Sequence, residues 1–301
     1  MRMSAPFVFM RLELRSPCKV NLLLNILGKR PDGFHELETL MHPVPVLDEL
    51  RFEVTPSGIA LTCSDPTLPV DGSNLVHRAA SSFLEAAKIT DGVRIHLEKR
   101  IPMAAGLGGG SGDAATTLLG LNELFGKPLN AAQLHSLAAT LGSDVPFFLQ
   151  TNPALATGRG ESVQSLSPFV ALADVWVLLI HPGFGIATAW AYQNLARFPR
   201  ALNGERGRGE RLVSTWLAGD LAGGMKLLYN SLEAPALEKY PILALYQEHL
   251  REAGALGALM SGSGSTTFAL AAGRTAAEQL REHFFAKFGS TAWTAVAPLA
   301  A

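Results

Sequence analysis

Apolar and polar residues alternate with two different periods along this chain, which predicts a mixture of strands and helices. Residues 49–54 and 93–98 alternate with a period of two, as half-buried strands do. Residues 19–27 form a nearly continuous apolar run that is also compatible with a strand. Between these strands, apolar residues recur at helical spacing over 74–88, and Asn74 can cap that helix.

The helical pattern continues after a glycine-rich stretch in the middle of the chain. Residues 113–125 carry alanines and leucines on one side, and Gly126 can end this helix. A further helix is predicted between Asn130 as its N-cap and Gly142 as its stop. The first half is therefore predicted to be an α+β unit.

The second half begins with another kind of pattern. The apolar run VWVLLI over 175–180 predicts a buried strand, and a short helix capped by Thr188 follows it. The segment 197–211 is rich in Arg, Gly and charge, so we predict a mobile surface loop there. Helix and strand patterns then return to the end of the chain. We predict two domains, at 1–165 and 166–301.

Composition and charge limit the classes of molecule that this chain can be expected to bind. Hydrophobic residues make up 48% of the 301 residues, charged residues 17%, and the formal net charge is −1. A compact protein that binds a small molecule, and neither nucleic acid nor a membrane, is the natural expectation. Cys18 and Cys63 cannot form a disulfide framework and lack zinc-ligand spacing, which favours a reducing cytoplasm. The first residues lack a signal-type apolar region, so we expect an unprocessed and frayed N-terminus.

The candidate chemistry lies in the stretch PMAAGLGGGSGDAA, residues 102–115. Glycines permit positive φ angles and leave backbone N–H groups uncovered, which is what a phosphate group needs. The helix that starts near Ser111 would point its N-terminal amides at the same anion. A flexible turn before a helix is the alternative interpretation.

Two common nucleotide motifs do not fit this stretch. GxxxxGK[ST] is absent, and counting GxGxxG from Gly106 ends on Ser111. A Rossmann oxidoreductase is therefore disfavoured. A second glycine turn, residues 261–265, is best interpreted as a hairpin-like turn, although it could approach the same phosphates.

Three stretches together resemble the galactokinase, homoserine kinase, mevalonate kinase and phosphomevalonate kinase (GHMP) superfamily: SPCKVNLLLNI, PMAAGLGGGSGDAA and LMSGSGSTTF. The resemblance implies an N-terminal domain like ribosomal protein S5 domain 2, a ferredoxin-like C-terminal domain, and a cleft where ATP meets substrate. KRPDGFHELETL, LGSDVPFFL, HPG and YNSLE are most similar to the branch that phosphorylates the 2-hydroxyl of a cytidine-diphosphate-linked methylerythritol.

The resemblance also implies roles for single residues. Asp144 would accept the proton of the substrate hydroxyl, and Lys19 would stabilise the charge that develops on the transferred phosphoryl group. Asn21 lies two residues beyond Lys19, so on a strand both side chains share one face and Asn21 could hydrogen-bond the substrate. Phe34 and Tyr192 would sandwich the cytosine and His35 would bind its polar edge, although core packing is the plainer role for an aromatic residue.

The nucleotide would be held by the whole glycine stretch, whose members are Pro102, Met103, Ala104, Ala105, Gly106, Leu107, Gly108, Gly109, Gly110, Ser111 and Gly112. Ala104 stands where the family usually has glycine, Gly112 where it usually has serine, and Phe34 where tyrosine is usual. Mg²⁺ is expected with ATP, but no carboxylate cluster and no histidine pattern indicates its ligands. Another kinase of this superfamily and a nucleotide-binding regulator without turnover remain the alternatives.

Overall fold

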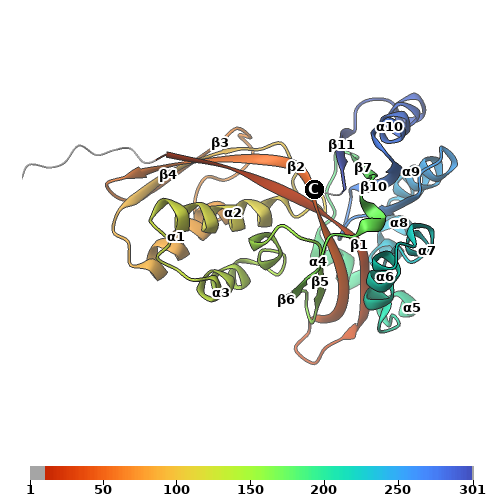
Figure 1. The fold of residues 1–301 in the computed structure, drawn as a ribbon, viewed down its shortest axis with the longest axis horizontal. Coiled ribbons are helices and arrows are strands. Elements are labelled where there is room, and N and C mark those ends of the chain that lie inside the picture. The colour runs from red at the N-terminus through yellow and green to blue at the C-terminus, as the bar shows by residue number, and fades with distance from the viewer. Residues whose placement is uncertain (1–10, 300–301) are drawn as a thin grey trace, which may run out of the picture. The chain divides into compact units, whose positions relative to one another are not determined.

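The computed structural model describes residues 11–299, which form a mixed fold of strands and helices (Figure 1). The chain forms two compact units, and each is assembled from separate segments. The first contains the N-terminal segment up to Ser16, Leu47–Arg100 and Gly110–Leu149, and the second contains Pro17–Val46, Ile101–Gly109 and Gln150–Ala301. The predicted domain boundary near residue 165 stays a prediction.

One seven-stranded sheet has the order β3-β4-β2-β1-β8, and β5 and β6 are attached to β2. Strand β4 runs antiparallel to β2 and parallel to β3. The strands of this seven-stranded sheet are β1 (Arg11–Lys29), β2 (His35–Thr55), β3 (Ile59–Cys63), β4 (Gly92–Glu98), β5 (Ala154–Thr157), β6 (Ser162–Ser165) and β8 (Tyr229–Asn230).

In the first unit, three helices accompany the strands (Figure 1): α1 (Leu75–Ala87), α2 (Gly109–Leu124) and α3 (Ala131–Leu141). Helix α2 packs directly against β2, because a Cβ on Gly120 would lie only 2.9 Å from the ring of Phe52. The predicted caps Asn74 and Asn130 are confirmed. Asn74 accepts from the Val76 N–H, and Asn130 forms a reciprocal capping box at the start of α3, which ends at Gly142.

The second unit contains an antiparallel sheet in the order β11-β7-β10-β9. Its strands are β7 (Val175–His181), β9 (Gly257–Met260), β10 (Thr267–Ala272) and β11 (Trp293–Pro298). Alternate residues of β7 contribute to two different cores: Val177 and Leu179 to one, Leu178 and Ile180 to the other. Burial on both faces explains why the predicted strand is a continuous apolar run.

Helices and short turns complete the second unit: η2 (Val170–Leu172), α4 (Thr188–Leu195), α5 (Pro199–Leu202), α6 (Arg208–Leu217), α7 (Leu221–Met225), α8 (Glu233–Lys239), α9 (Pro241–Glu252) and α10 (Arg274–Phe288). Helices α9 and α10 lie beside the four-stranded sheet (Figure 1). None of the helices within residues 11–299 is long and apolar enough to cross a membrane.

Two local predictions are wrong. Thr188 does not cap α4, because Ala187 occupies the cap position and the Thr188 hydroxyl lies 2.9 Å from Ser263 Oγ instead. The segment 197–211 is not a loop throughout, since it contains α5 and the start of α6. A carboxylate from β2 anchors it, because Glu38 accepts from the Gly207 and Gly209 N–H groups at 2.7 and 3.2 Å. The predicted frayed N-terminus lies mostly outside the described residues, and from Arg11 the chain is strand.

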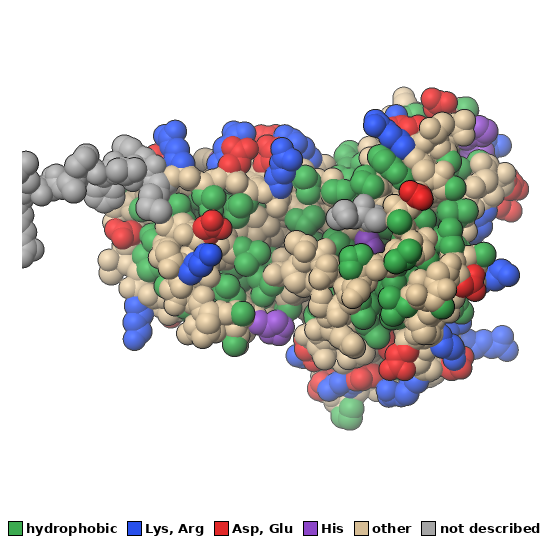
Figure 2. Space-filling model, in the orientation of Figure 1, with side chains coloured by type: hydrophobic (Ala, Val, Ile, Leu, Met, Phe, Trp, Pro, Cys, Tyr) green, Lys and Arg blue, Asp and Glu red, His purple; other side chains and the backbone are tan. Residues whose placement is uncertain are grey.

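On the face shown in Figure 2, Lys and Arg side chains are interspersed with Asp and Glu, so neither sign of charge forms a broad patch. This distribution agrees with the formal net charge of −1. No long-range field therefore distinguishes one region of that face, and specific binding has to come from local geometry.

Candidate active site

The glycine stretch is held in the second unit by its apolar residues. Ala105 and Leu107 are buried, and both belong to the core formed around β1 and the four-stranded sheet. Gly106 and Gly108, which alternate with them, have φ angles of +77° and +69°. These left-handed conformations favour glycine. The loop is therefore fixed at alternate residues, and the glycines between them carry no side chain of their own.

Helix α2 begins at Gly109, two residues before the start expected near Ser111. The final glycines therefore lie in the first helical turn. The first N–H groups of a helix have no acceptor within the helix, and the helix dipole places partial positive charge there. The start of α2 therefore has the unpaired amides and the dipole that an anion site requires, and anion binding there stays a prediction.

The second glycine turn packs directly against the first. It joins β9 to β10, which pair antiparallel, so the predicted hairpin is confirmed. Ser261 Oγ donates to the Gly106 carbonyl oxygen at 2.9 Å, and the Thr266 N–H donates to the Ala105 carbonyl oxygen at 3.1 Å. A Cβ on Gly106 would lie 2.0 Å from the Ser261 carbonyl oxygen. This close approach requires glycine at position 106.

Lys19 is buried at the same place. It lies within β1, and it is only 2% exposed. Its Nζ donates to the Gly106 carbonyl oxygen at 2.8 Å and to Asn21 Oδ1 at 2.5 Å. The backbone N–H of Lys19 donates to the Leu107 carbonyl oxygen at 2.9 Å. Strand β1 therefore presents a cation to the glycine loop.

Asn21 shares a face with Lys19, as its spacing predicts. Its Nδ2 donates to Thr39 Oγ1 at 2.8 Å, and its backbone N–H donates to Ser261 Oγ at 3.3 Å. Sequence reasoning missed Thr39 and the local role of Ser261. The polar side chain of Thr39 within the apolar part of β2 was the only signal for it.

Asp144 lies in the first unit, in the turn between α3 and the 3₁₀ helix η1 (Pro146–Leu149). Asp144 is half-buried, and the two residues after it, Val145 and Pro146, are buried. These apolar neighbours fix the turn that carries the carboxylate. Its predicted pairing with Lys19, which belongs to the second unit, stays a prediction.

The predicted base-binding residues belong to the second unit. Phe34 is 54% exposed, so its ring is not part of a core, and the Arg159 guanidinium lies 4.7 Å from its ring centroid. The rings of His35 and Tyr192 lie 5.0 Å apart at an angle of 37°. Partial burial and the neighbouring charge of Lys29 lower the pKa of His35, which favours its neutral imidazole.

Ala104, the departure from the family's glycine, has a left-handed φ of +51°. Such a backbone is uncommon for alanine, which explains why glycine is usual there. The chain accommodates the methyl group through Gly185, because a Cβ added to Gly185 would lie 2.8 Å from the Ala104 Cβ. Gly112, the other departure, is buried inside α2.

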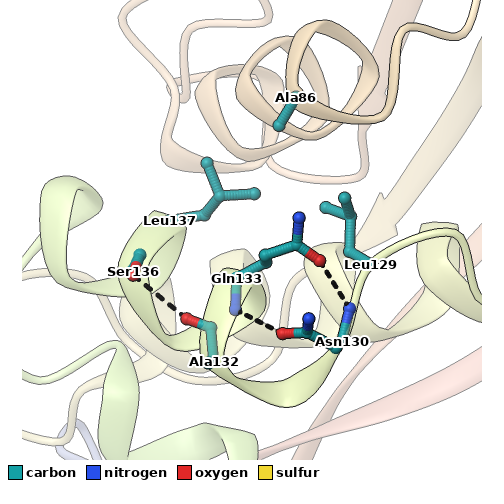
Figure 3. A pocket seen from close by; sticks show the side chains of 7 residues that line it. All are labelled: Ala86, Leu129, Asn130, Ala132, Gln133, Ser136 and Leu137. Carbon is teal, nitrogen blue, oxygen red and sulfur yellow. Dashed lines mark hydrogen bonds between the residues drawn. The ribbon is translucent and has the colours of Figure 1, made fainter.

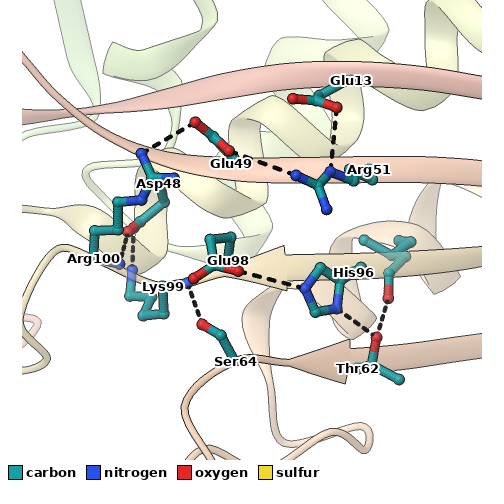
Figure 4. A network of polar contacts seen from close by, with 11 residues as sticks. Glu13, Asp48, Glu49, Arg51, Thr62, Ser64, His96, Glu98, Lys99 and Arg100 are labelled. Atoms are coloured by element: carbon teal, nitrogen blue, oxygen red, sulfur yellow. Dashed lines mark hydrogen bonds and ion pairs between the residues drawn. The ribbon is translucent and has the colours of Figure 1, made fainter.

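A cluster of buried charged residues in the first unit lies at the two ends of the glycine stretch. This cluster was not predicted from the sequence. Lys99 Nζ binds the carboxylate of Asp48, which also accepts from the Arg100 N–H at 2.6 Å (Figure 4). Lys99 Nζ binds the carboxylate of Asp113 as well, at 2.7 Å. Burial, opposed by Lys99 and assisted by Asp48, raises the pKa of Asp113 to about 7. Lys99 precedes the loop and Asp113 follows it, so this cluster sets where the loop leaves and re-enters the unit.

A hollow between α1 and α3 has no comparable chemistry (Figure 3). Its polar side chains Asn130 and Gln133 are occupied by the capping box, and none of its lining residues is titratable. Among the described residues, no group of three or more His, Cys, Asp or Glu could hold a metal ion. The chemistry therefore concentrates at the glycine loop.

Comparison with known proteins agrees with this geometry. Residues 74–152 match the family described as GHMP kinases N terminal domain, and residues 214–290 match GHMP kinases C terminal. The chain belongs to the GHMP kinase family, so the predicted membership and α+β fold are confirmed. A relative from Syntrophotalea carbinolica named 4-diphosphocytidyl-2-C-methyl-D-erythritol kinase is 40% identical over 283 residues, covering 94% of this chain and 96% of the relative.

Two solved structures have the same fold. The crystal structure of a 4-(cytidine 5'-diphospho)-2C-methyl-D-erythritol kinase matches with a TM-score of 0.80 and 38% identity, covering 95% of this chain and 98% of that one. Homoserine kinase from Cytophaga hutchinsonii matches with a TM-score of 0.76 and 20% identity, covering 99% and 98% of the two chains. The second likeness shows the fold alone.

Proposed function

We propose that this chain transfers the γ-phosphoryl group of ATP to the 2-hydroxyl of 4-diphosphocytidyl-2-C-methyl-D-erythritol, giving the 2-phosphate and ADP. This step belongs to the non-mevalonate pathway to isopentenyl diphosphate. The names of relatives at about 40% identity over most of the chain support the substrate. The observation that carries the reaction type is the buried ammonium of Lys19, hydrogen-bonded to Gly106 of the glycine loop at 2.8 Å.

Phosphoryl transfer depends mainly on positioning and on stabilising charge. The glycine stretch 102–112 would cradle the nucleotide phosphates through its uncovered amides and the start of α2. Lys19, buried beside that loop, would stabilise the negative charge on the transferred group, since an ammonium acts more strongly away from water. Asp144 would accept the proton of the attacking hydroxyl.

The substrate's base would be held by the aromatic residues of the second unit. Phe34 offers an exposed ring face, and Tyr192 lies beside His35. The neutral imidazole of His35 suits hydrogen bonds to the edge of a cytosine. Asn21 would bind the polyol, although both ends of its amide already hold Lys19 and Thr39.

Mg²⁺ belongs to the proposal only as a companion of the nucleotide. Mg²⁺ in such sites is bound largely by phosphate oxygens and water, with one or two protein carboxylates. The described residues offer no cluster of three ligands, so we assign it no residue. A cytoplasmic location is also proposed, since the two cysteines, Cys18 and Cys63, provide no disulfide framework.

The test is ADP release by the purified protein with Mg-ATP and the cytidyl substrate, beside mevalonate, homoserine and galactose. Turnover with the cytidyl substrate alone is expected. Lys19→Met and Asp144→Asn should each fold normally and lose at least about a hundredfold in kcat. Turnover with another alcohol would overturn the substrate, and nucleotide binding without any turnover would favour a regulator.

A further inference from the structure

The side-chain amide of Asn21 is held at both ends. Its Oδ1 accepts from Lys19 Nζ at 2.5 Å, and its Nδ2 donates to Thr39 Oγ1 at 2.8 Å. The two ends of an amide are not interchangeable, because the oxygen accepts hydrogen bonds and the nitrogen donates them. Turning the amide by half a rotation would place an NH₂ group against the ammonium of Lys19. The orientation of Asn21 therefore decides whether its amide can accept from Lys19, which also donates to the Gly106 carbonyl oxygen.

Thr39 determines that orientation. Its Oγ1 donates to the Leu23 carbonyl oxygen at 2.7 Å, and a hydroxyl has only one proton to donate. Towards Asn21 the same oxygen can only accept, so the Nδ2 end must face it. The ammonium of Lys19 can only donate and the carbonyl of Leu23 can only accept. Every hydrogen bond from Lys19 through Asn21 and Thr39 to Leu23 consequently has one possible direction.

The side chains that form this chain of hydrogen bonds are all buried, which raises the cost of losing any one of the bonds. Lys19 is 2% exposed, and Asn21 and Thr39 are each 4% exposed, so water is poorly placed to substitute for a lost partner. Leaving a buried donor unsatisfied costs about 1–3 kcal/mol. All the residues concerned lie in the second unit, together with Gly106, which accepts from Lys19 at 2.8 Å. The position of the ammonium at the glycine loop is thus set from β2.

We propose that Thr39 is a positioning residue for phosphoryl transfer: its hydroxyl orients the Asn21 amide, and that amide holds the Lys19 ammonium beside the glycine loop. This inference rests on the proposed function of Lys19. Thr39 itself need not touch ATP or the phosphoryl acceptor. Its hydroxyl is the required group, so serine should replace threonine and valine should not.

The test compares Thr39→Val, which keeps the shape and removes the hydroxyl, with Thr39→Ser. Thr267→Val is the matched control, because Thr267 is a fully buried strand residue of the same unit whose Oγ1 has no hydrogen-bond partner within the described part of the chain. We expect Thr39→Val to lower kcat by about tenfold to a hundredfold, since small misplacements of catalytic groups have effects of this size. Its KM for ATP should stay within about threefold, because the glycine loop is unchanged.

Thr39→Ser should keep kcat within about threefold of the parent, and Thr267→Val within about twofold. A second readout is the NMR signal of the Lys19 ammonium, assigned by its loss in Lys19→Met. The signal should be sharp in the parent, in Thr39→Ser and in Thr267→Val, and broadened or lost in Thr39→Val. If Thr39→Val does not fold, Thr39→Ala takes its place in both measurements.

The inference is overturned if Thr39→Val retains kcat within about twofold, or if Thr39→Ser falls as far as Thr39→Val. An unchanged ammonium signal in Thr39→Val would overturn it as well. Failure of the proposed function looks different, because the parent protein would then not phosphorylate the cytidyl substrate at all. In that case the ammonium signal still decides whether Thr39 positions Lys19.

Discussion

Gly106 and Ser261 approach each other so closely that a methyl group on the Gly106 α-carbon would lie 2.0 Å from the Ser261 carbonyl oxygen. The two residues are 155 positions apart in the sequence, and the Ser261 hydroxyl also donates to the Gly106 carbonyl at 2.9 Å. The hairpin turn between β9 and β10 therefore packs against the glycine loop at Gly106 and supports it. Any side chain at position 106 must separate these two segments.

Gly106→Ala should for this reason abolish measurable ATP binding or weaken it by at least about a hundredfold, because the loop must move away from its support. Gly58→Ala is the matched control. Gly58 has the same φ of +77°, but a Cβ there would meet nothing within 4 Å. The control should lose only about 1–2 kcal/mol of stability from its left-handed backbone and keep its ATP affinity. Calorimetric titration with ATP and urea unfolding measure both effects, and equal losses in the two variants would contradict the explanation.

Ala104 and Gly185 form a second close pair, and it predicts a double-mutant cycle. Gly185→Ala should destabilise the protein by about 1–3 kcal/mol, because its Cβ would lie 2.8 Å from that of Ala104. Adding Ala104→Gly removes the facing methyl group and should recover part of that loss. Urea unfolding of the parent, both single variants and the double variant gives the coupling energy. Strict additivity would show that the two methyl groups do not meet.

Asp113 should make stability depend on pH in an identifiable direction. Its pKa is raised from 3.8 to about 7, so the folded protein retains a proton that the unfolded chain releases. This contribution to stability is complete below the unfolded pKa and is lost as the pH rises through about 7. Asp113→Asn stays neutral and lacks that loss. Its stability relative to the parent should therefore improve by about 1–3 kcal/mol between pH 5 and pH 8.

The groups that face Asp113 come from several segments of the chain. The ammonium of Lys99 binds its carboxylate, the carboxylate of Asp48 repels it, and the hydroxyl of Ser16 opposes the rise of its pKa. Urea midpoints at the two pH values give the measurement. Asp71→Asn is a suitable control, because hydrogen bonds from Ser73 lower the pKa of Asp71, so that group is ionised in both the folded and the unfolded state between pH 5 and pH 8 and its removal should leave the pH dependence parallel to the parent's. A parallel response of Asp113→Asn and the parent would contradict the assignment.

Glu38 should control the local stability of the arginine-rich segment. Its carboxylate accepts from the N–H groups of Gly207 and Gly209, and hydrogen bonds to charged groups contribute about 1.5–3 kcal/mol. Glu38→Gln should accelerate trypsin cleavage after Arg206 or Arg208 by about tenfold or more. Glu36→Gln removes a partly exposed pair with Arg30 and should change the rate less than about twofold. Mass spectrometry of the fragments identifies the cut.

Features with local causes could be predicted from the sequence. The capping box of Asn130 with Gln133 is formed by residues three apart, and the apolar run of β7 reports burial on both faces. Features with distant causes could not. Lys19 looks like an exposed strand residue until Gly106, 87 positions later, accepts its hydrogen bond.

The length of β1 was also underestimated, for a related reason. Only residues 18–26 of it are continuously buried, whereas residues 11–15 alternate between exposed and half-buried positions. Pairing with the long strand β2 keeps the polar beginning of β1 in the sheet. The segment 197–211 was misinterpreted similarly, because the start of α6 there is anchored by Glu38 from far earlier in the sequence.

The dependence of the glycine loop on the β9–β10 hairpin has a consequence during protein synthesis. When the ribosome has made the loop and helix α2, the hairpin that supports Gly106 is still about 130 codons from being translated. A nascent chain at that stage contains every amide of the predicted phosphate cradle and lacks the contact that shapes it. Nucleotide can therefore assist the maturation of this protein only after nearly the whole chain has emerged, and chains stalled before Ser261 are left without that protection.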